Sequence, residues 1–285
     1  MDGVILINKE KGMTSQNVVS KVKRILNLDK AGHAGTLDPN ATGVLPILVN
    51  KGTKLSKYLI EHDKIYIATL KLGEKRSTGD IEGEIIETDN SQIKDISKEK
   101  ILEVLESFKG IQNQIPPIYS ALKVNGKKLY DYARNGEEVE IKPRKINIYD
   151  IKLLEIYDES NEIKFEVSCS KGTYIRVLCE DIASRLNTVG YMSDLQRTRV
   201  NNFDISESIT ISELEENKDI KIIEVEDLFL DKEKINLNNR KEELFLNGVM
   251  LTFEYPDGIY RIYNNDKFIG LGTVQNKLLK RDIVL

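Results

Sequence analysis

Apolar residues along the first seventy positions follow the periods of strands and helices. An apolar run at 4–7 has the length and composition of a short buried strand. Apolar residues then recur at helical spacing from Val18 to Leu26, after Thr14, a preferred helix-capping residue. At 64–73 alternate positions are apolar, which predicts a strand with one buried face. This part of the chain therefore contains both kinds of element.

The middle of the chain continues this mixture of periods. A helix is predicted from Ser97 through Phe108, and two alternating strands at about 139–157 and 162–168. Helical spacing returns within the segment 170–186. Strands and helices do not alternate in a strict βαβ order, so we expect an α+β fold with a mixed, largely antiparallel central sheet and flanking helices.

The last quarter of the chain changes character twice. An acidic stretch covers 204–231, and short strand patterns follow it at intervals typical of all-β domains. We therefore expect a large domain at 1–230, long enough to hold a catalytic site, and a small β-rich domain at 231–285.

Composition excludes several classes of protein. No segment has the roughly 20 uncharged apolar residues that span a bilayer, and the apolar run at 4–7 is too short for a signal peptide, so we expect a cytoplasmic protein. Two cysteines cannot form a disulfide framework, and two histidines give no zinc-ligand spacing. We therefore expect no metal.

The net charge of −4 hides an uneven distribution. The acidic stretch carries −8, so the remainder carries +4. The segment 9–30 has six basic residues against two acids, and 123–145 has seven against four. Such segments are often solvated helix faces, but they also suit phosphate binding on an otherwise acidic protein.

The segment 31–43, AGHAGTLDPNATG, has three glycines, one proline and no periodicity, and we expect a loop. Asp38 lies in it on a short, rigid stem, where a carboxylate can act as nucleophile or base. Taken alone, it could equally form an Asx turn beside Pro39. The glycines match neither the P-loop motif GxxxxGK[ST] nor the dinucleotide-binding motif GxGxxG. The sequence has no nucleophile elbow, which disfavours a Ser-His-Asp hydrolase that uses His33.

Several blocks of sequence, in order, resemble the TruB family of tRNA pseudouridine-55 synthases. The blocks are NKEKGMTS, HAGTLDPNATGVLPI, KIYIATLKLG, PPIYSALKVNGKKLYDYAR, SKGTYIRVLCEDI and LQRTRV. The resemblance covers about residues 3–203, and the segment after the acidic stretch looks like the small PUA-type RNA-binding domain of relatives. This chain has Glu10 where the family commonly has proline.

The resemblance implies an isomerase that converts uridine to pseudouridine at position 55 in the TΨC loop of tRNA, without a cofactor. Asp38 matches the family's catalytic aspartate, and Arg176 the arginine that pairs with it. Tyr66 matches the active-site tyrosine, which stacks on the base. Tyr174 and Leu195 match the remaining positions of the pocket.

The same resemblance implies how the RNA is held. The target uridine must leave its stack, and His33 matches the histidine that fills its place. The basic segment that begins at Lys9 and the insert at 123–145 would hold phosphates of the TΨC stem-loop. We expect a monomer with no protein partner.

Two other functions remain open on the sequence. A tRNA-binding folding chaperone, with incidental or no modification activity, would need none of the three catalytic candidates. A synthase acting on ribosomal or guide-directed RNA is disfavoured by the ordered blocks and the short chain.

Overall fold

The computed structural model describes residues 1–60, 62–91 and 93–285, and within them the main sheet has ten strands. Eight strands follow one path across the sheet, and two short strands pair beside it. In spatial order they are β14 (Ile223–Glu224), β1 (Gly3–Lys9), β3 (Thr42–Val49), β12 (Gly190–Val200), β4 (Lys64–Leu72), β11 (Glu162–Cys169), β10 (Arg144–Tyr157) and β7 (Gly110–Gln114), with β2 (Ala31–His33) on β3 and β13 (Phe203–Asp204) on β12.

The sheet is mixed and largely antiparallel, which confirms the predicted fold class. Its one parallel pair among the named strands of the described residues joins β3 to β12. There Gly43, at φ +106°, lies so close to β12 that a Cβ atom would stand 2.1 Å from the carbonyl oxygen of Arg197. Strand β12, late in the chain, is therefore inserted between the early strands β3 and β4.

Helices cover the sheet and share one hydrophobic core with it. As predicted, Thr14 caps the first helix, and its hydroxyl accepts a hydrogen bond from the Asn17 amide. The alternation along β4 is also confirmed, since Ala68, Leu70 and Leu72 are buried. The helices that contribute to this core are α1 (Ser15–Ile25), α3 (Lys98–Glu106), α5 (Ile175–Arg185) and α6 (Ile211–Glu216).

Two sequence-based boundaries were wrong. The segment 31–43 is not a loop throughout, because Ala31–His33 pair with β3 as strand β2 and β3 itself begins at Thr42. The strand expected from residue 139 begins only at Arg144. Pro143, which lacks an amide donor, precedes it.

The acidic stretch packs against the main domain. Helix α6 begins with a capping box formed by Thr210 and Glu213, and it buries Ile211 and Leu214. The short strand β14 then pairs with the edge of β1. The acidic side chains thus lie on elements that belong to the main sheet and its core.

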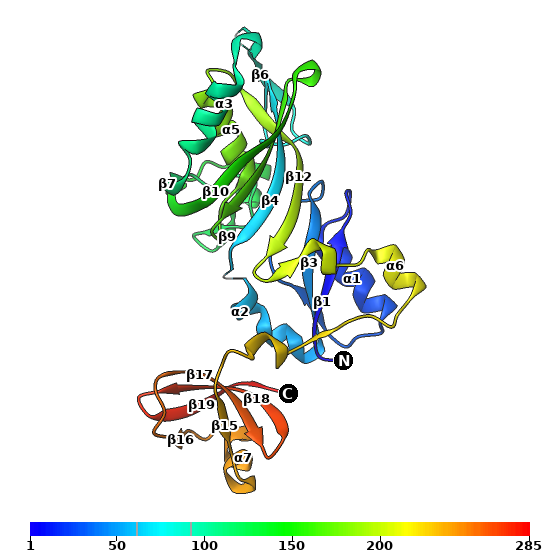
Figure 1. Cartoon of the computed structure of the whole chain (residues 1–285), viewed down its shortest axis with the longest axis vertical. Coiled ribbons are helices and arrows are strands. Elements are labelled where there is room, and N and C mark those ends of the chain that lie inside the picture. Colours follow the sequence, from blue (N-terminus) through cyan, green and yellow to red (C-terminus); the bar gives the residue numbers. More distant parts are fainter. Residues whose placement is uncertain (61, 92) are drawn as a thin grey trace.

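The C-terminal residues form a second, five-stranded sheet, shown in orange and red in Figure 1. It contacts α2 (Ser56–Leu59) and the 3-10 turn before it, because Tyr58 donates a hydrogen bond to Asp282 and Lys54 donates one to the Val284 carbonyl at 2.8 Å. Its elements are β15 (Lys234–Asn236), α7 (Asn239–Leu246), β16 (Leu251–Thr252), β17 (Gly258–Asn264), β18 (Lys267–Gln275) and β19 (Leu278–Val284).

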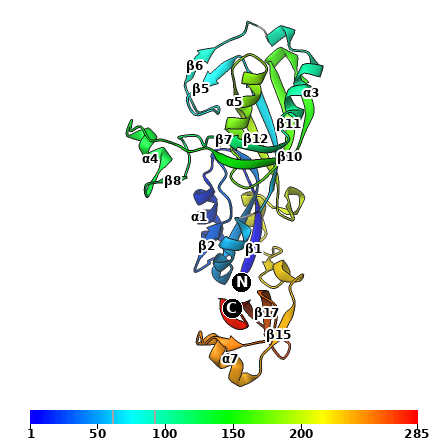
Figure 2. The ribbon, with the colours of Figure 1, turned by 90° about the vertical axis from the view of Figure 1, so that its left-hand side faces the viewer.

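Two hairpins extend from the main sheet. The first joins β5 (Glu74–Arg76) to β6 (Ile85–Thr88). The second joins β8 (Lys123–Val124) to β9 (Lys127–Lys128) through an Asn-Gly turn and leads into α4 (Leu129–Arg134). Figure 2 shows this second segment projecting to one side of the sheet. No helix of the described residues is long and apolar enough to cross a membrane.

Candidate active site

A cavity of about 590 Å³ opens where the β2–β3 loop meets the starts of β4, β10 and α5 and the strand β12. It gathers five of the residues that the sequence nominated. They are Asp38, Tyr66, Tyr174, Arg176 and Leu195. Residues more than a hundred positions apart thus share one surface.

Arg176 and Asp38 form an ion pair at this cavity, with 3.1 Å between Nε and Oδ2. The guanidinium is buried and also donates to the carbonyls of Thr78, at 3.1 Å, and Tyr119, at 3.0 Å. A second carboxylate, that of Asp80, lies 3.6 Å from Nη1. Because partners surround the planar guanidinium, its orientation is fixed, and so is the carboxylate oxygen that it holds.

Gln114 fixes the segment that delivers Arg176. Its buried side-chain amide accepts a hydrogen bond from the Tyr174 amide at 2.8 Å and donates one to the Tyr174 carbonyl at 3.0 Å. Tyr174 is the residue that precedes α5, and Arg176 lies in the first turn of that helix. The end of β7 therefore positions the start of α5.

Buried polar groups also hold the loop that carries Asp38. The Ser15 hydroxyl accepts from the Leu37 amide at 2.9 Å and donates to the Leu37 carbonyl at 3.0 Å. Arg197, fully buried, donates to the carbonyls of Gly35 at 3.0 Å and Val44 at 2.9 Å, at the two ends of the loop. The loop is thereby held to α1 and β12, which limits the positions that its carboxylate can take.

Lys9 does not lie where a phosphate could reach it, contrary to the sequence-based expectation. Its side chain is fully buried, and its ammonium donates to the carbonyls of Pro39 and Glu10, each at 2.9 Å. Burial lowers the pKa of Lys9 to about 8, although the Asp38 carboxylate opposes this shift. In the structure Lys9 stabilises the Asp38 loop through its hydrogen bond to the Pro39 carbonyl.

A pH-dependent stability difference should follow from this burial. Between pH 8 and 10 the Lys9 ammonium is less protonated in the folded chain than in the unfolded chain. The free energy of unfolding therefore rises with pH in this range because of Lys9. The free energy of unfolding of wild type, minus that of a Lys9→Met variant, should therefore increase by on the order of 2 kcal/mol across this window. Urea titrations at several pH values measure it, and a constant difference would contradict the assignment.

Tyr66 and His33 both carry uncharged rings at neutral pH. Burial raises the pKa of Tyr66 to about 12, and the charge of Arg197 only partly opposes this. Burial, reinforced by Arg197, lowers the pKa of His33 below its usual value. Tyr66 faces the cavity, whereas His33 lies on β2 outside its lining, with a buried Nδ1 that has no hydrogen-bond partner among the described residues.

The cavity is strongly cationic although the whole chain has a net charge of −4. Asp38 is the one carboxylate among the described residues that line it. The cationic residues of the lining are Lys64, Arg144, Lys145, Lys171, Arg176 and Arg197. Such a surface favours a polyanionic substrate and binds it through its phosphates.

Sequence reasoning missed several of these residues, including Gln114, Ser15 and Arg197. Arg197 could have been found, since it lies two positions after Leu195 on the same strand and therefore on the same face. Gln114 and Ser15 gave no signal, because their partners lie 60 and 22 positions away along the chain.

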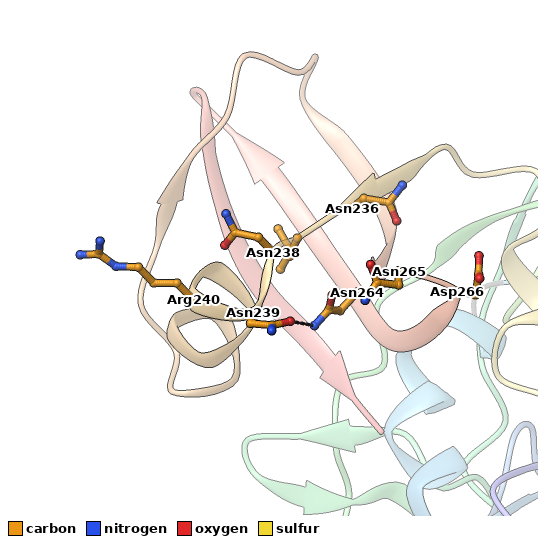
Figure 3. Close-up of a pocket in the computed structure, with 8 residues that line it drawn as sticks. Asn236, Asn238, Asn239, Arg240, Asn264, Asn265 and Asp266 are labelled. Atoms are coloured by element: carbon orange, nitrogen blue, oxygen red, sulfur yellow. Dashed lines mark hydrogen bonds between the residues drawn. The ribbon is translucent and has the colours of Figure 1, made fainter.

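A second hollow lies on the C-terminal sheet, beside the start of α7 (Figure 3). It has a volume of about 860 Å³ and is lined mainly by asparagines. Two of its amides bond to each other, since Asn264 donates to Asn239 at 2.8 Å. Arg240 and Asp266 also line it.

Comparison with known proteins yields two family matches. The description "TruB family pseudouridylate synthase (N terminal domain)" matches residues 23–175, and "tRNA pseudouridylate synthase B C-terminal domain" matches residues 176–232. Together they cover 23–232, which includes every residue that lines the cavity and the acidic stretch but not strand β1.

Individual relatives match along nearly the whole chain. A tRNA pseudouridine synthase B of Francisella philomiragia is 43% identical and covers 100% of this chain and 97% of its own. That of Clostridium kluyveri is 44% identical and covers 95% of each. Among solved structures, a chain of a Cbf5-Nop10-Gar1 complex aligns with a TM-score of 0.68 at 26% identity, over 99% of this chain and 83% of its own.

Proposed function

Because the chain belongs to the TruB family of pseudouridylate synthases, we propose that it isomerises uridine to pseudouridine at position 55, in the TΨC loop of tRNA. The observation that carries this proposal is the Asp38–Arg176 ion pair, which lies in a cationic cavity beside Tyr66. The reaction breaks the bond between the ribose and N1 of uracil and forms a bond to C5. The hydrogen at C5 leaves as a proton and N1 takes up a proton, so the reaction is an isomerisation with no redox change.

Asp38 supplies the anion that this isomerisation needs. A carboxylate can attack the anomeric carbon, add to the pyrimidine ring, or assist elimination from the ribose, and each route requires it to be ionised and fixed. The ion pair with Arg176 fixes the carboxylate in one orientation, and the exposed 39% of the Asp38 side chain leaves it accessible from the cavity. Arg176 thus acts by holding Asp38 in orientation.

Tyr66, Tyr174 and Leu195 shape the slot for the uracil. The Tyr66 ring can stack on the base, and its hydroxyl remains a proton donor at neutral pH. Leu195, on β12, lines the same cavity with an apolar side chain. Apolar walls exclude water and so protect an intermediate from hydrolysis.

The RNA contacts extend beyond the cavity. The β8–α4 segment projects to one side of the main sheet (Figure 2), and the seven basic residues of 123–145 suit the phosphates of the stem-loop. Residues 1–230 form the catalytic domain of this proposal, and 231–285 a PUA-like RNA-binding domain. The enzyme acts as a cytoplasmic monomer, without a cofactor or a protein partner.

The folding-chaperone alternative is not favoured. A protein that only binds and remodels tRNA has no use for an oriented carboxylate in a stacking pocket, and the curated relatives are named as synthases.

Tritium release from an unmodified tRNA transcript labelled at C5 of uridine tests the proposed function. Wild type should release one tritium per transcript, and a transcript that lacks only the target uridine should release none. Binding of both transcripts without release from either would favour the chaperone.

His33→Ala should slow the reaction about tenfold under single-turnover conditions. The imidazole is the ring proposed to fill the gap left by the extruded uridine, and extrusion costs a few kcal/mol. His33→Phe should restore most of the rate, because it also provides a ring. A loss as complete as that of an Asp38 variant would mean that His33 takes part in the chemistry.

A further inference from the structure

Ser120 presents a buried hydroxyl that the protein leaves unpaired. The residue is 6% exposed, and its Oγ has no hydrogen-bond partner among the described residues. Leaving a buried hydroxyl unpaired costs about 1–3 kcal/mol, so native structures rarely tolerate it without a reason. Ser120 lies in the block PPIYSALK, and its side chain has no role in the proposed function described so far.

Ser120 is one of the residues that line the cavity of Asp38, so its hydroxyl lies close to the proposed chemistry. Five buried polar side-chain atoms lack hydrogen-bond partners in the described part of the chain, and those of Ser120 and Arg197 belong to this lining. The charge of Arg197 already acts on the Tyr66 hydroxyl. Ser120 therefore offers a neutral, buried hydroxyl without a protein partner in the lining of this cavity.

Main-chain hydrogen bonds hold this hydroxyl in place. The Ser120 amide donates to the Ile118 carbonyl at 3.0 Å, and its carbonyl accepts from the Tyr130 amide at 3.1 Å. The preceding carbonyl, of Tyr119, accepts from Arg176 at 3.0 Å. Ser120 is thus fixed relative to Arg176, and through it to Asp38, without using its own side chain.

We propose that Ser120 is a substrate-binding residue whose hydroxyl hydrogen-bonds a polar atom of the extruded uridine and holds the nucleotide against Asp38. The inference rests on the proposed function. A hydroxyl both donates and accepts, so its partner is an oxygen of the ribose, or an oxygen or the N3–H group of the uracil. The cost of the unpaired group in the free enzyme is removed when the nucleotide binds.

Ser120→Ala separates this role from a structural one. Removal of an unpaired hydroxyl breaks no protein contact, so the midpoint of urea unfolding should stay the same or rise. Loss of the substrate contact should lower kcat/KM for tritium release ten- to a hundredfold. A kcat/KM within twofold of wild type, or a parallel loss of stability and activity, would overturn the proposal.

Ser160→Ala is the matched control. The Ser160 hydroxyl donates to Glu162 at 2.9 Å, at the turn between β10 and β11. This substitution should therefore lower the unfolding midpoint and leave kcat/KM within twofold of wild type, the opposite of the pattern expected for Ser120→Ala.

A transcript with 2′-deoxyuridine at the target position identifies the atom that is bound. If the partner is the ribose 2′-hydroxyl, Ser120→Ala causes no further loss of kcat/KM on this transcript. If the partner is elsewhere on the nucleotide, the losses of kcat/KM caused by Ser120→Ala and by the missing 2′-hydroxyl multiply. The affinity for the unmodified transcript is measured in parallel. Absence of release by wild type, together with weaker binding by Ser120→Ala, would refute the isomerase but retain the contact.

Discussion

An Asp38→Asn variant should bind tRNA about as well as wild type and release tritium on the order of 10⁴-fold more slowly, a loss typical of removing a central catalytic residue. The amide has the size of the carboxylate but cannot be ionised, so every route that begins at Asp38 is closed. Arg176 keeps the Thr78 and Tyr119 carbonyls as partners, and folding should therefore be nearly unchanged. Single-turnover release and filter binding measure the two effects.

Asp80→Asn is the matched control for this variant. Its carboxylate also neighbours Arg176, at 3.6 Å, but Asp80 does not line the cavity that holds Tyr66 and Leu195. It also accepts hydrogen bonds from Thr78 and from the Glu82 amide, so its loss should affect stability more than chemistry. Turnover by Asp38→Asn within tenfold of wild type would refute the assignment of Asp38.

Arg176→Lys should lower the rate on the order of 10²-fold even though it keeps the positive charge. A lysine ammonium is a point charge that cannot serve the Asp38 carboxylate and two carbonyls in one plane, and a displacement of about 1 Å at a reacting group has this cost. Arg176→Met, which also removes the charge, should in addition lower the free energy of unfolding by about 2 kcal/mol. Single-turnover rates and urea unfolding measure both variants.

Arg185→Lys provides the comparison on the same helix. Arg185 lies in the last turn of α5, is exposed, and donates to the Ser107 hydroxyl at 2.6 Å. The Arg185→Lys variant should keep a single-turnover rate and a free energy of unfolding close to those of wild type. If Arg176→Lys behaves like Arg185→Lys, the orientation of Asp38 does not depend on the guanidinium.

Local patterns predicted the elements of the main sheet well, since one-sided burial leaves a period in the sequence. The alternation along β4 and the spacing in α1 are direct consequences of such burial. The failures lie where long-range pairing decides the outcome. Ala31–His33 carry no alternation that marks a strand, and they become one because β3 offers them an open edge.

The site was predicted only in part for the same reason. Asp38, Tyr66 and Arg176 were nominated by the family resemblance, and the structure places them around one cavity. A basic segment in the sequence does not reveal which lysine is buried, so Lys9 was assigned to the RNA surface. The hydrogen-bond partner of the Lys9 ammonium, the Pro39 carbonyl, lies 30 positions away in the sequence, and the residues around Lys9 do not indicate this contact.

The position of β12 also bears on how the enzyme is made. The strand that separates the Asp38 loop from the Tyr66 strand is synthesised only after residue 190, although both of its neighbours leave the ribosome much earlier. Until it arrives, β3 and β4 have no common partner, and the Gly35 and Val44 carbonyls lack the Arg197 guanidinium. A nascent or truncated chain that ends before β12 therefore cannot assemble the catalytic pocket, which delays activity until the domain is complete.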